Sequence, residues 1–149
     1  MEIYVNSIQK RIDIDPEGLR KKTEKILEDL GCNPDSILSI VLVDSAKMAE
    51  LNLKYRGKEG PTNVLSFSQL EGDAPPQENL LGDVIICADR AADDAAELGY
   101  TEDQMLLYLL IHGILHLLGH SHEYPSDAEA MSAKVEEIFL KFCPQAEPA

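Results

Sequence analysis

The segment from residue 105 to residue 122 constrains the fold most, because it joins a strongly apolar helix to a cluster of histidines. Leucine and isoleucine occur on nearly every side of its first part, which predicts a central helix buried in the protein. His112 and His116 are four residues apart, so on a helix both imidazoles project from the same face. Gly119 tolerates a positive φ and can end the helix. We therefore expect the chain to turn there and to bring His122 back toward the first two histidines.

Three imidazoles that converge on one point, with a fourth position open, are typical of a catalytic zinc site. We expect His112, His116 and His122 to bind one Zn²⁺ ion per chain, and another divalent transition metal could use the same ligands. His120 is the alternative third ligand, but it lies eight residues after His112. On a straight helix that spacing is about 12 Å, at about 1.5 Å per residue, which is too far for zinc–nitrogen bonds of about 2.0–2.1 Å.

The histidines could also belong to a plain helix end or to a peptidase. Protonated histidines at the end of a helix are favourable with the helix dipole, but all four histidines of this chain lie within eleven residues of one another. The spacing also overlaps the metzincin peptidase pattern H-E-x-x-H-x-x-G-x-x-H. Gly113 stands where that pattern has its catalytic glutamate, so a peptidase would lack its general base.

The length and composition predict a single globular domain over residues 1–149, with residues 144–149 frayed. The chain is 44% hydrophobic and 27% charged, which favours a folded protein over a disordered one. No apolar run reaches the length of a membrane span, and the N-terminus lacks the features of a secretory signal. We expect a cytoplasmic protein with no membrane partner. Cys32, Cys87 and Cys143 are too far apart in sequence for a disulfide framework, so we expect free thiols.

The formal net charge of −14 argues against broad, sequence-independent binding of nucleic acid, and we expect no DNA partner. A polyanion would be met only locally, where basic residues gather. The group in residues 20–25 is typical of a solvated helix face. Lys54, Arg56 and Lys58 form a second group, close to a loop, and are the better candidates for contacts with phosphate.

Hydrophobic periodicity predicts an α+β fold with a four-stranded mixed sheet and about five helices. The expected strands cover residues 3–6, 37–43, 62–67 and 81–87. The expected helices begin near residues 15, 44, 89, 101 and 125, where capping residues or proline occur. The fourth of these is the central buried helix that carries the histidines. In the second, we expect Met48, Leu51 and Leu53 to be the apolar positions.

Three segments carry a resemblance to a known family. They are residues 56–67 (R-G-x-x-x-P-T-N-V-L-S-F), residues 81–86 (L-G-D-V-I-I) and the histidine stretch. Together they resemble the YbeY family, bacterial metal-dependent endoribonucleases linked to maturation of ribosomal RNA, and the resemblance covers nearly the whole chain. It implies that His112, His116 and His122 hold zinc and that Arg56 is a functional residue of the active-site cleft.

The histidine stretch departs from the family pattern at two positions. The usual motif ends H-L-x-G-Y-D-H, whereas His120 stands here in place of tyrosine and Ser121 in place of aspartate. His122 keeps the ligand position. Ser121 would orient a ligand only weakly, and His120 adds a titratable group beside the metal.

The resemblance implies a single-strand-specific endoribonuclease that acts on ribosomal RNA, with the ribosome or ribosomal proteins as partners. Zinc with three histidine ligands leaves room for a water whose pKa falls to about 7. Arg56 is the candidate that stabilises charge on the phosphate, because a guanidinium forms paired hydrogen bonds with phosphate. Lys54 and Lys58 are candidates for neighbouring phosphates. A non-catalytic ribosome-assembly factor with bound zinc, and another metal hydrolase, remain the alternatives.

The general base and any stacking residues are less well defined by the sequence. Asp83 and His120 are the candidates for the base, and the 2′-OH of RNA is an alternative nucleophile. Tyr55 and Phe67 flank the Arg56 segment and are candidates for stacking on bases. Packing in the core is the competing role for Phe67.

Overall fold

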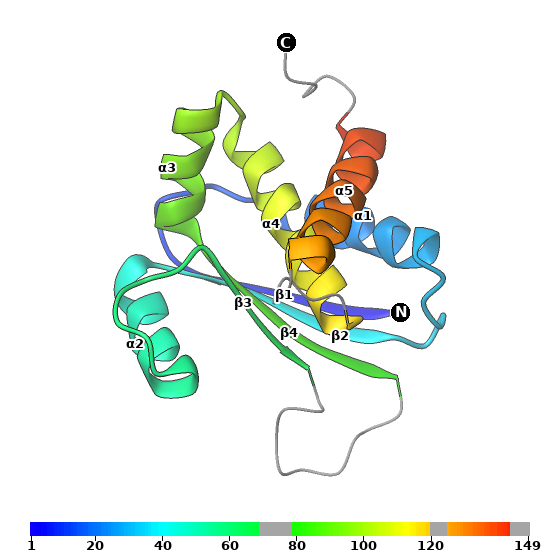
Figure 1. The fold of residues 1–149 in the computed structure, drawn as a ribbon, viewed down its shortest axis with the longest axis horizontal. Helices are drawn as coiled ribbons and strands as arrows, with labels where there is room; N and C mark the ends of the chain where they lie inside the picture. Colours follow the sequence, from blue (N-terminus) through cyan, green and yellow to red (C-terminus); the bar gives the residue numbers. More distant parts are fainter. Residues whose placement is uncertain (69–78, 120–124, 144–149) are drawn as a thin grey trace.

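The computed structural model describes residues 1–68, 79–119 and 125–143, and it shows an α+β fold built on one mixed sheet (Figure 1). The strands are β1 (Glu2–Ile8), β2 (Ile37–Val43), β3 (Val64–Ser68) and β4 (Leu80–Cys87). The helices are α1 (Pro16–Asp29), α2 (Ser45–Arg56), α3 (Ala88–Leu98), α4 (Glu102–Leu117) and α5 (Pro125–Phe142). The predicted fold class is confirmed, with β1 extending further than expected at both ends.

The order of the sheet explains which strand lies next to the histidine helix. The strands are arranged β1-β2-β4-β3, with β1, β2 and β4 parallel and β3 antiparallel to β4. Strand β3 therefore forms one edge of the sheet. Helices α1, α3, α4 and α5 cover one face, and α2 lies against the other (Figure 1).

The larger core lies between the sheet and the four helices on its first face. Leu38, Ile40 and Leu42 of β2 and Val84 and Ile86 of β4 point into this core at every second position. This alternation follows from the pleat of a strand, which sends successive side chains to opposite faces. A smaller core lies on the other face, beneath α2.

The smaller core corrects one expectation about α2. Met48 is buried there as predicted, but Leu53 is 58% exposed, and Asn52 is buried instead. Met48 and Asn52 lie one helical turn apart on the same face, whereas Leu53 is rotated away from it. The Asn52 amide is satisfied because its Nδ2 donates a hydrogen bond to the carbonyl oxygen of Gly60 at 2.8 Å.

Helix α4 has the central position that its composition predicts. Thr101 caps its first turn, accepting a hydrogen bond from the backbone N–H of Gln104, while the Gln104 side chain accepts one from the N–H of Thr101. Its apolar residues are buried on nearly all sides. The helix ends at Leu117, and Gly119 adopts a φ of +97°. The predicted stop is therefore confirmed.

The cysteines agree with a smaller expectation. All three cysteines are free thiols, and Cys87 is the one that is fully buried. No helix in the described ranges is both long enough and apolar enough to cross a lipid bilayer.

Candidate active site

A cavity of about 290 Å³ lies beside the edge strand β3, between α4 and the segment that connects α2 to β3. Segments that are far apart in the sequence form its walls. The residues that line it are Asn52, Arg56, Lys58, Glu59, Thr62, Val64, Leu65, Ser66, His112 and His116. The structure thus brings two of the predicted metal ligands into one cavity with Arg56 and Lys58.

His112 and His116 form the α4 wall of this cavity. They are one helical turn apart and both are partly buried, so their rings share a face of the helix. The residues around them on α4, including Ile111, Ile114 and Leu115, are fully buried in the larger core. Packing of this density leaves the helix backbone little freedom to shift. The two imidazoles are therefore presented from a rigid support.

Gly113, between the two histidines, packs tightly against the sheet. A Cβ atom at this position would lie 2.7 Å from Cγ1 of Val84 and 3.1 Å from Oγ of Ser66. The buried Ser66 hydroxyl donates a hydrogen bond to the carbonyl oxygen of Gly113 at 3.1 Å. There is no room for a glutamate here, which gives a physical reason for the departure from the peptidase pattern.

Arg56 forms the opposite wall, at the C-terminal end of α2. The helix stops because Gly57 adopts a left-handed conformation, with a φ of +66°. The Arg56 guanidinium donates from Nη2 to the carbonyl oxygen of Ser66 at 2.8 Å, and its Cζ lies 4.7 Å from the centre of the Phe67 ring. In β3, the carbonyl of Ser66 points away from β4, because hydrogen-bonded and non-bonded pairs alternate along an antiparallel ladder. Arg56 is thus fixed across the open edge of the sheet.

The turn after Arg56 carries two more charged residues of the wall. The backbone N–H of Lys58 donates to the carbonyl oxygen of Asn52 at 3.3 Å, and the Asn52 side chain holds Gly60. These two contacts place Lys58 and Glu59 at the cavity. Glu59 is the one carboxylate among the described residues that line it.

Four polar residues of the wall had no role predicted from the sequence, namely Asn52, Glu59, Thr62 and Ser66. Thr62 and Ser66 lie within the segment that carries the family resemblance, so their position was available as a signal. Asn52 offered only a weak signal, as a polar residue one turn after Met48. No signal in the sequence distinguishes Glu59 from the other acidic residues of this chain.

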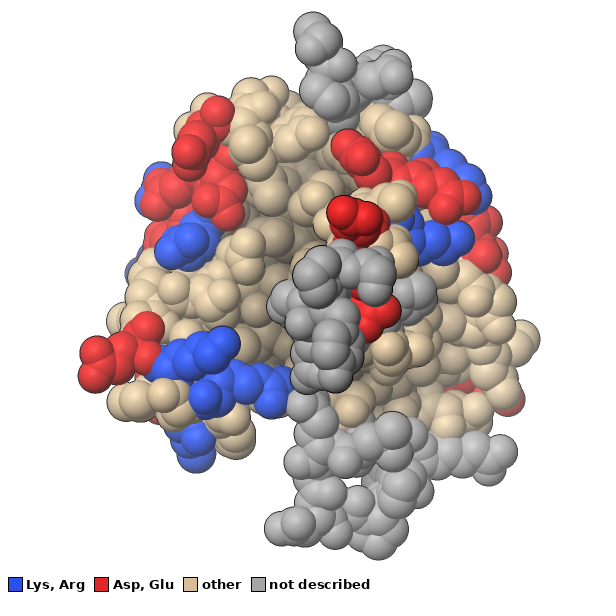
Figure 2. Space-filling model, viewed as in Figure 1, with Lys and Arg blue, Asp and Glu red and all other residues tan. Residues whose placement is uncertain are grey.

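Basic side chains gather around this wall, although the whole chain is acidic. Figure 2 shows lysine and arginine side chains over α2 and the loop that follows it, with acidic side chains beside them and on other parts of the same face. With a net charge of −14, long-range attraction of RNA is unfavourable over most of the surface. Arg56 and Lys58 of the cavity wall are therefore basic residues on a protein that is acidic overall.

The remaining predicted site residues lie elsewhere or outside the described residues. Lys54 does not line the cavity, and its Nζ lies 5.2 Å from the centre of the Tyr55 ring. Asp83 lies between Ser39 and Phe67 in the sheet. Its neighbour Val84 faces α4, so the Asp83 side chain projects from the opposite face. The structure therefore does not bring Asp83 to the cavity.

Burial affects Asp83 even though its side chain projects from the face of the sheet opposite α4. Partial burial raises the pKa of its carboxyl group, and a hydrogen bond with the Ser39 side chain opposes this rise. The pKa rises because the charged carboxylate is less stable when it is removed from water. The carboxyl group that titrates therefore lies on the face of the sheet that α2 covers, and not at the cavity.

The described residues that line the cavity include donors that fit a divalent metal ion. His112 and His116 present two imidazoles from one helix face into a polar cavity, which is the arrangement that zinc and similar ions accept. His120 and His122 lie outside the described residues. Within the described ranges, no group of three or more histidine, cysteine, aspartate or glutamate residues is placed to hold a metal. The three-histidine zinc site therefore stays a prediction.

Comparison with known proteins gives a consistent set of relatives. The family described as "Endoribonuclease YbeY" matches residues 4–143. The protein named Endoribonuclease YbeY of Geobacter sulfurreducens is 45% identical over 142 residues, which cover 93% of this chain and 94% of that protein. The one of Syntrophotalea carbinolica is 42% identical with the same coverage. The solution structure of TM1509 from Thermotoga maritima is 28% identical, covers 99% of this chain and 96% of that one, and has a TM-score of 0.60.

Proposed function

This chain belongs to the YbeY family of endoribonucleases, and from that premise we propose that it cleaves single-stranded RNA at the cavity between α4 and β3. The observation that carries the proposal is the meeting of His112 and His116 with Arg56 in one polar cavity. Partly buried imidazoles suit a metal, and a guanidinium suits a phosphate. The two together fit a phosphodiester better than a peptide.

Zinc is the proposed cofactor, held by His112, His116 and His122. When bound, it would supply an activated water and would polarise a phosphate oxygen. The role of helix α4 is to hold the imidazoles of His112 and His116 at a fixed separation. Gly113 contributes by letting the helix lie directly against the sheet, so that both rings open onto the cavity.

Arg56 is proposed to bind the phosphate that is cleaved. One N–H of its guanidinium is engaged by the carbonyl oxygen of Ser66, which fixes the orientation of the planar group. A guanidinium carries five N–H donors, and a fixed fork can donate two parallel hydrogen bonds to phosphate. Negative charge grows on the phosphate oxygens in the transition state, so these hydrogen bonds become stronger as the reaction proceeds.

Lys58 and Glu59, in the turn after Arg56, are proposed to act on the substrate beside it. Lys58 would contact a neighbouring phosphate as a point charge. Glu59 can accept a proton at its carboxylate, and it replaces Asp83 as the candidate base because it lines the cavity. The nucleophile that loses this proton is a water or the 2′-OH of the RNA.

Ribosomal RNA is the proposed substrate, with the ribosome or ribosomal proteins as partners in maturation and quality control. The charge distribution supports a partner, because the chain carries −14 overall and concentrates its phosphate contacts at one wall. Such a protein has few contacts with which to bind free RNA tightly. A partner that holds both protein and RNA would raise their effective concentration.

Metal content and RNA cleavage, measured together on the wild-type protein and on His116→Ala, test the proposal. We expect about one zinc per wild-type chain and loss of zinc in the variant. Cleavage of a single-stranded RNA should fall at least about a thousandfold, because metal catalysis supplies several kcal/mol. Leu118→Ala changes an exposed residue at the end of the same helix and is the matched control.

The outcomes separate the competing functions. Wild-type protein that binds zinc but cleaves no RNA, alone or with ribosomes, would favour a non-catalytic assembly factor. Zinc content that is unchanged in His116→Ala would rule out this metal site. Cleavage of peptides in place of RNA would move the protein to another class of metal hydrolase.

A further inference from the structure

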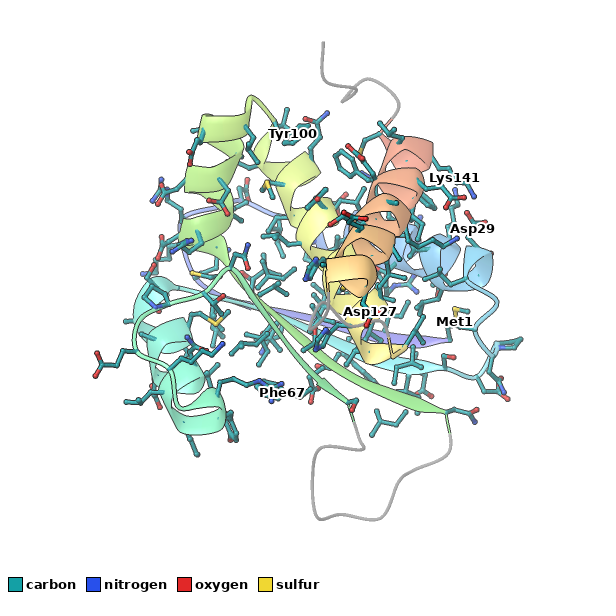
Figure 3. The ribbon with its side chains drawn as sticks, viewed as in Figure 1. Met1, Asp29, Phe67, Tyr100, Asp127 and Lys141 are labelled. Carbon is teal, nitrogen blue, oxygen red and sulfur yellow. The ribbon has the colours of Figure 1, made fainter. Side chains whose placement is uncertain are left out.

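An exposed tyrosine, which the sequence offered as a candidate for stacking on bases, lies next to Arg56 but has no part in the cleavage chemistry proposed above. Tyr55 precedes Arg56 at the end of α2 and is 52% exposed. Its ring packs edge-to-face on Phe67, with 5.3 Å between ring centres and 62° between planes. Phe67 in turn lies under the Arg56 guanidinium. Figure 3 shows Phe67 on the side of the sheet where α2 lies.

These contacts connect the tyrosine to the cavity in two steps. Arg56 lines the cavity, and Phe67 contacts both Arg56 and Tyr55. The Tyr55 ring is therefore held near the guanidinium, and its orientation is limited by packing against Phe67. A large aromatic ring that is supported on one side and exposed to solvent is what a base-stacking site requires.

We propose that Tyr55 stacks on a base of the RNA, next to the nucleotide whose phosphate binds Arg56. This inference rests on the proposed function and identifies the feature of the substrate that the site selects. A base can stack on a side chain only when its face is not already covered by its neighbours in a helix. Tyr55 is thus a specificity residue that favours single-stranded over double-stranded RNA.

Lys54 fits this role because its ammonium lies over the Tyr55 ring, 5.2 Å from its centre. Both side chains are exposed. An exposed cation–π contact changes an equilibrium by only about two- to fivefold. Stacking of a base on an aromatic ring changes it by about 5- to 150-fold. A base can therefore displace the ammonium from the ring.

The test compares three variants of the full-length, zinc-loaded protein in steady-state cleavage of a labelled single-stranded RNA. Tyr55→Leu removes the aromatic ring, and Tyr55→Phe keeps it. Tyr4→Leu removes a tyrosine of similar exposure, 57%, from β1 at the far edge of the sheet. We expect Tyr55→Leu to raise KM by about 5- to 150-fold with little change in kcat, because a ground-state contact is lost. Tyr55→Phe and Tyr4→Leu should retain wild-type values.

A scan with abasic nucleotides identifies the contact directly. One abasic position in the RNA should raise KM for the wild-type protein and have no further effect with Tyr55→Leu, since both changes remove the same contact. Additive effects at every position would overturn the proposal, as would a wild-type KM for Tyr55→Leu or an equal loss in Tyr4→Leu. If the wild-type protein cleaves no RNA, the proposed function itself has failed. A failure confined to Tyr55 leaves that function intact.

Discussion

On one side of the cavity, His112 and His116 project from a helix that is buried in the larger core, while on the other side Arg56 and Lys58 extend from an exposed helix end and turn. The histidine wall depends on packing between α4 and the sheet. The arginine wall depends on a few hydrogen bonds and ring contacts at the surface.

The difference matches what each wall would have to bind. A metal ion requires ligands at distances fixed to within about 0.2 Å, and a rigid support provides this. A phosphate is bound through hydrogen bonds, which a guanidinium held by a few surface contacts can donate without support from the core. Changes on the histidine wall should therefore affect folding stability and metal binding together, whereas changes on the arginine wall should affect catalysis with little change in folding stability.

Among the variants that test the difference between the two walls, replacement of Arg56 by alanine should give the largest effect. We expect kcat for RNA cleavage to fall by about a hundred- to a thousandfold, the usual loss for one donor to a developing charge. Zinc content should not change, and the free energy of unfolding should fall by no more than about 1 kcal/mol, as for most exposed residues. Steady-state kinetics, elemental analysis and urea unfolding measure these three quantities.

Two further variants sharpen this result. Arg56→Lys keeps the charge but not the planar fork, so most of the loss in kcat should remain. Lys58→Ala should mainly raise KM. A loss of zinc in Arg56→Ala would show that the two walls are not independent.

Replacement of Gly113 by alanine tests the histidine wall. The new Cβ would lie 2.7 Å from Cγ1 of Val84, so the Val84 side chain, α4 or β4 must shift. We expect the free energy of unfolding to fall by about 1–3 kcal/mol, as is usual for overpacking. Zinc affinity should fall as well, because the flanking histidines move with the helix. Thermal unfolding and zinc titration provide the measurements.

The double variant Gly113→Ala with Val84→Ala is the control for this test. Val84→Ala alone leaves a cavity and lowers stability, but in the double variant the two changes compensate in volume. The combined loss should be clearly smaller than the sum of the single losses. Strict additivity would mean that the close approach at Gly113 does not determine the position of α4.

Replacement of Asp83 by asparagine should give the smallest effect. Burial raises the pKa of this carboxyl, so the native state binds its proton more tightly than the unfolded chain does. Its ionisation therefore lowers stability as the pH rises from the unfolded pKa through the folded pKa. Asp83→Asn removes this loss and should be more stable near neutral pH by less than about 1 kcal/mol, since water screens the partly exposed group.

Urea unfolding between about pH 3 and pH 8 measures this difference, with the pH slope set by the protons bound in each state. The gain should shrink at the acid end of the range. RNA cleavage should remain at the wild-type level because Asp83 lies on the face opposite α4. A large loss of cleavage without unfolding would place Asp83 back in the mechanism.

Local sequence patterns predicted the elements that carry the site. Thr101 and Gly119 mark where α4 begins and where the chain leaves it, and the spacing of His112 and His116 alone places both rings on one face. These features depend on interactions within a few residues, which a sequence displays directly. For the same reason, the four strands were predicted close to their observed ends.

Features that depend on the order of the strands could not be obtained in this way. Arg56 and His112 line the same cavity because β3 lies beside β4 at the edge of the sheet. Only the family resemblance indicated that these two residues would lie together. Asp83 was correctly predicted to lie in a strand. The face of the sheet from which its side chain projects depends on how β4 pairs with β2 and β3. Leu53 and Asn52 of α2 differ in burial because the second core is small and because the turn at Gly60 needs a donor.

The hydrogen bond from Arg56 to Ser66 has a consequence for how this protein behaves in a crowded cell. An edge strand with outward-pointing carbonyls is a template on which another chain can add a strand, and such pairing leads to aggregates. A charged side chain bound across that edge blocks the added strand. The same guanidinium would therefore protect the molecule from self-association whenever no RNA is bound. Loss of Arg56 would then reduce solubility as well as activity.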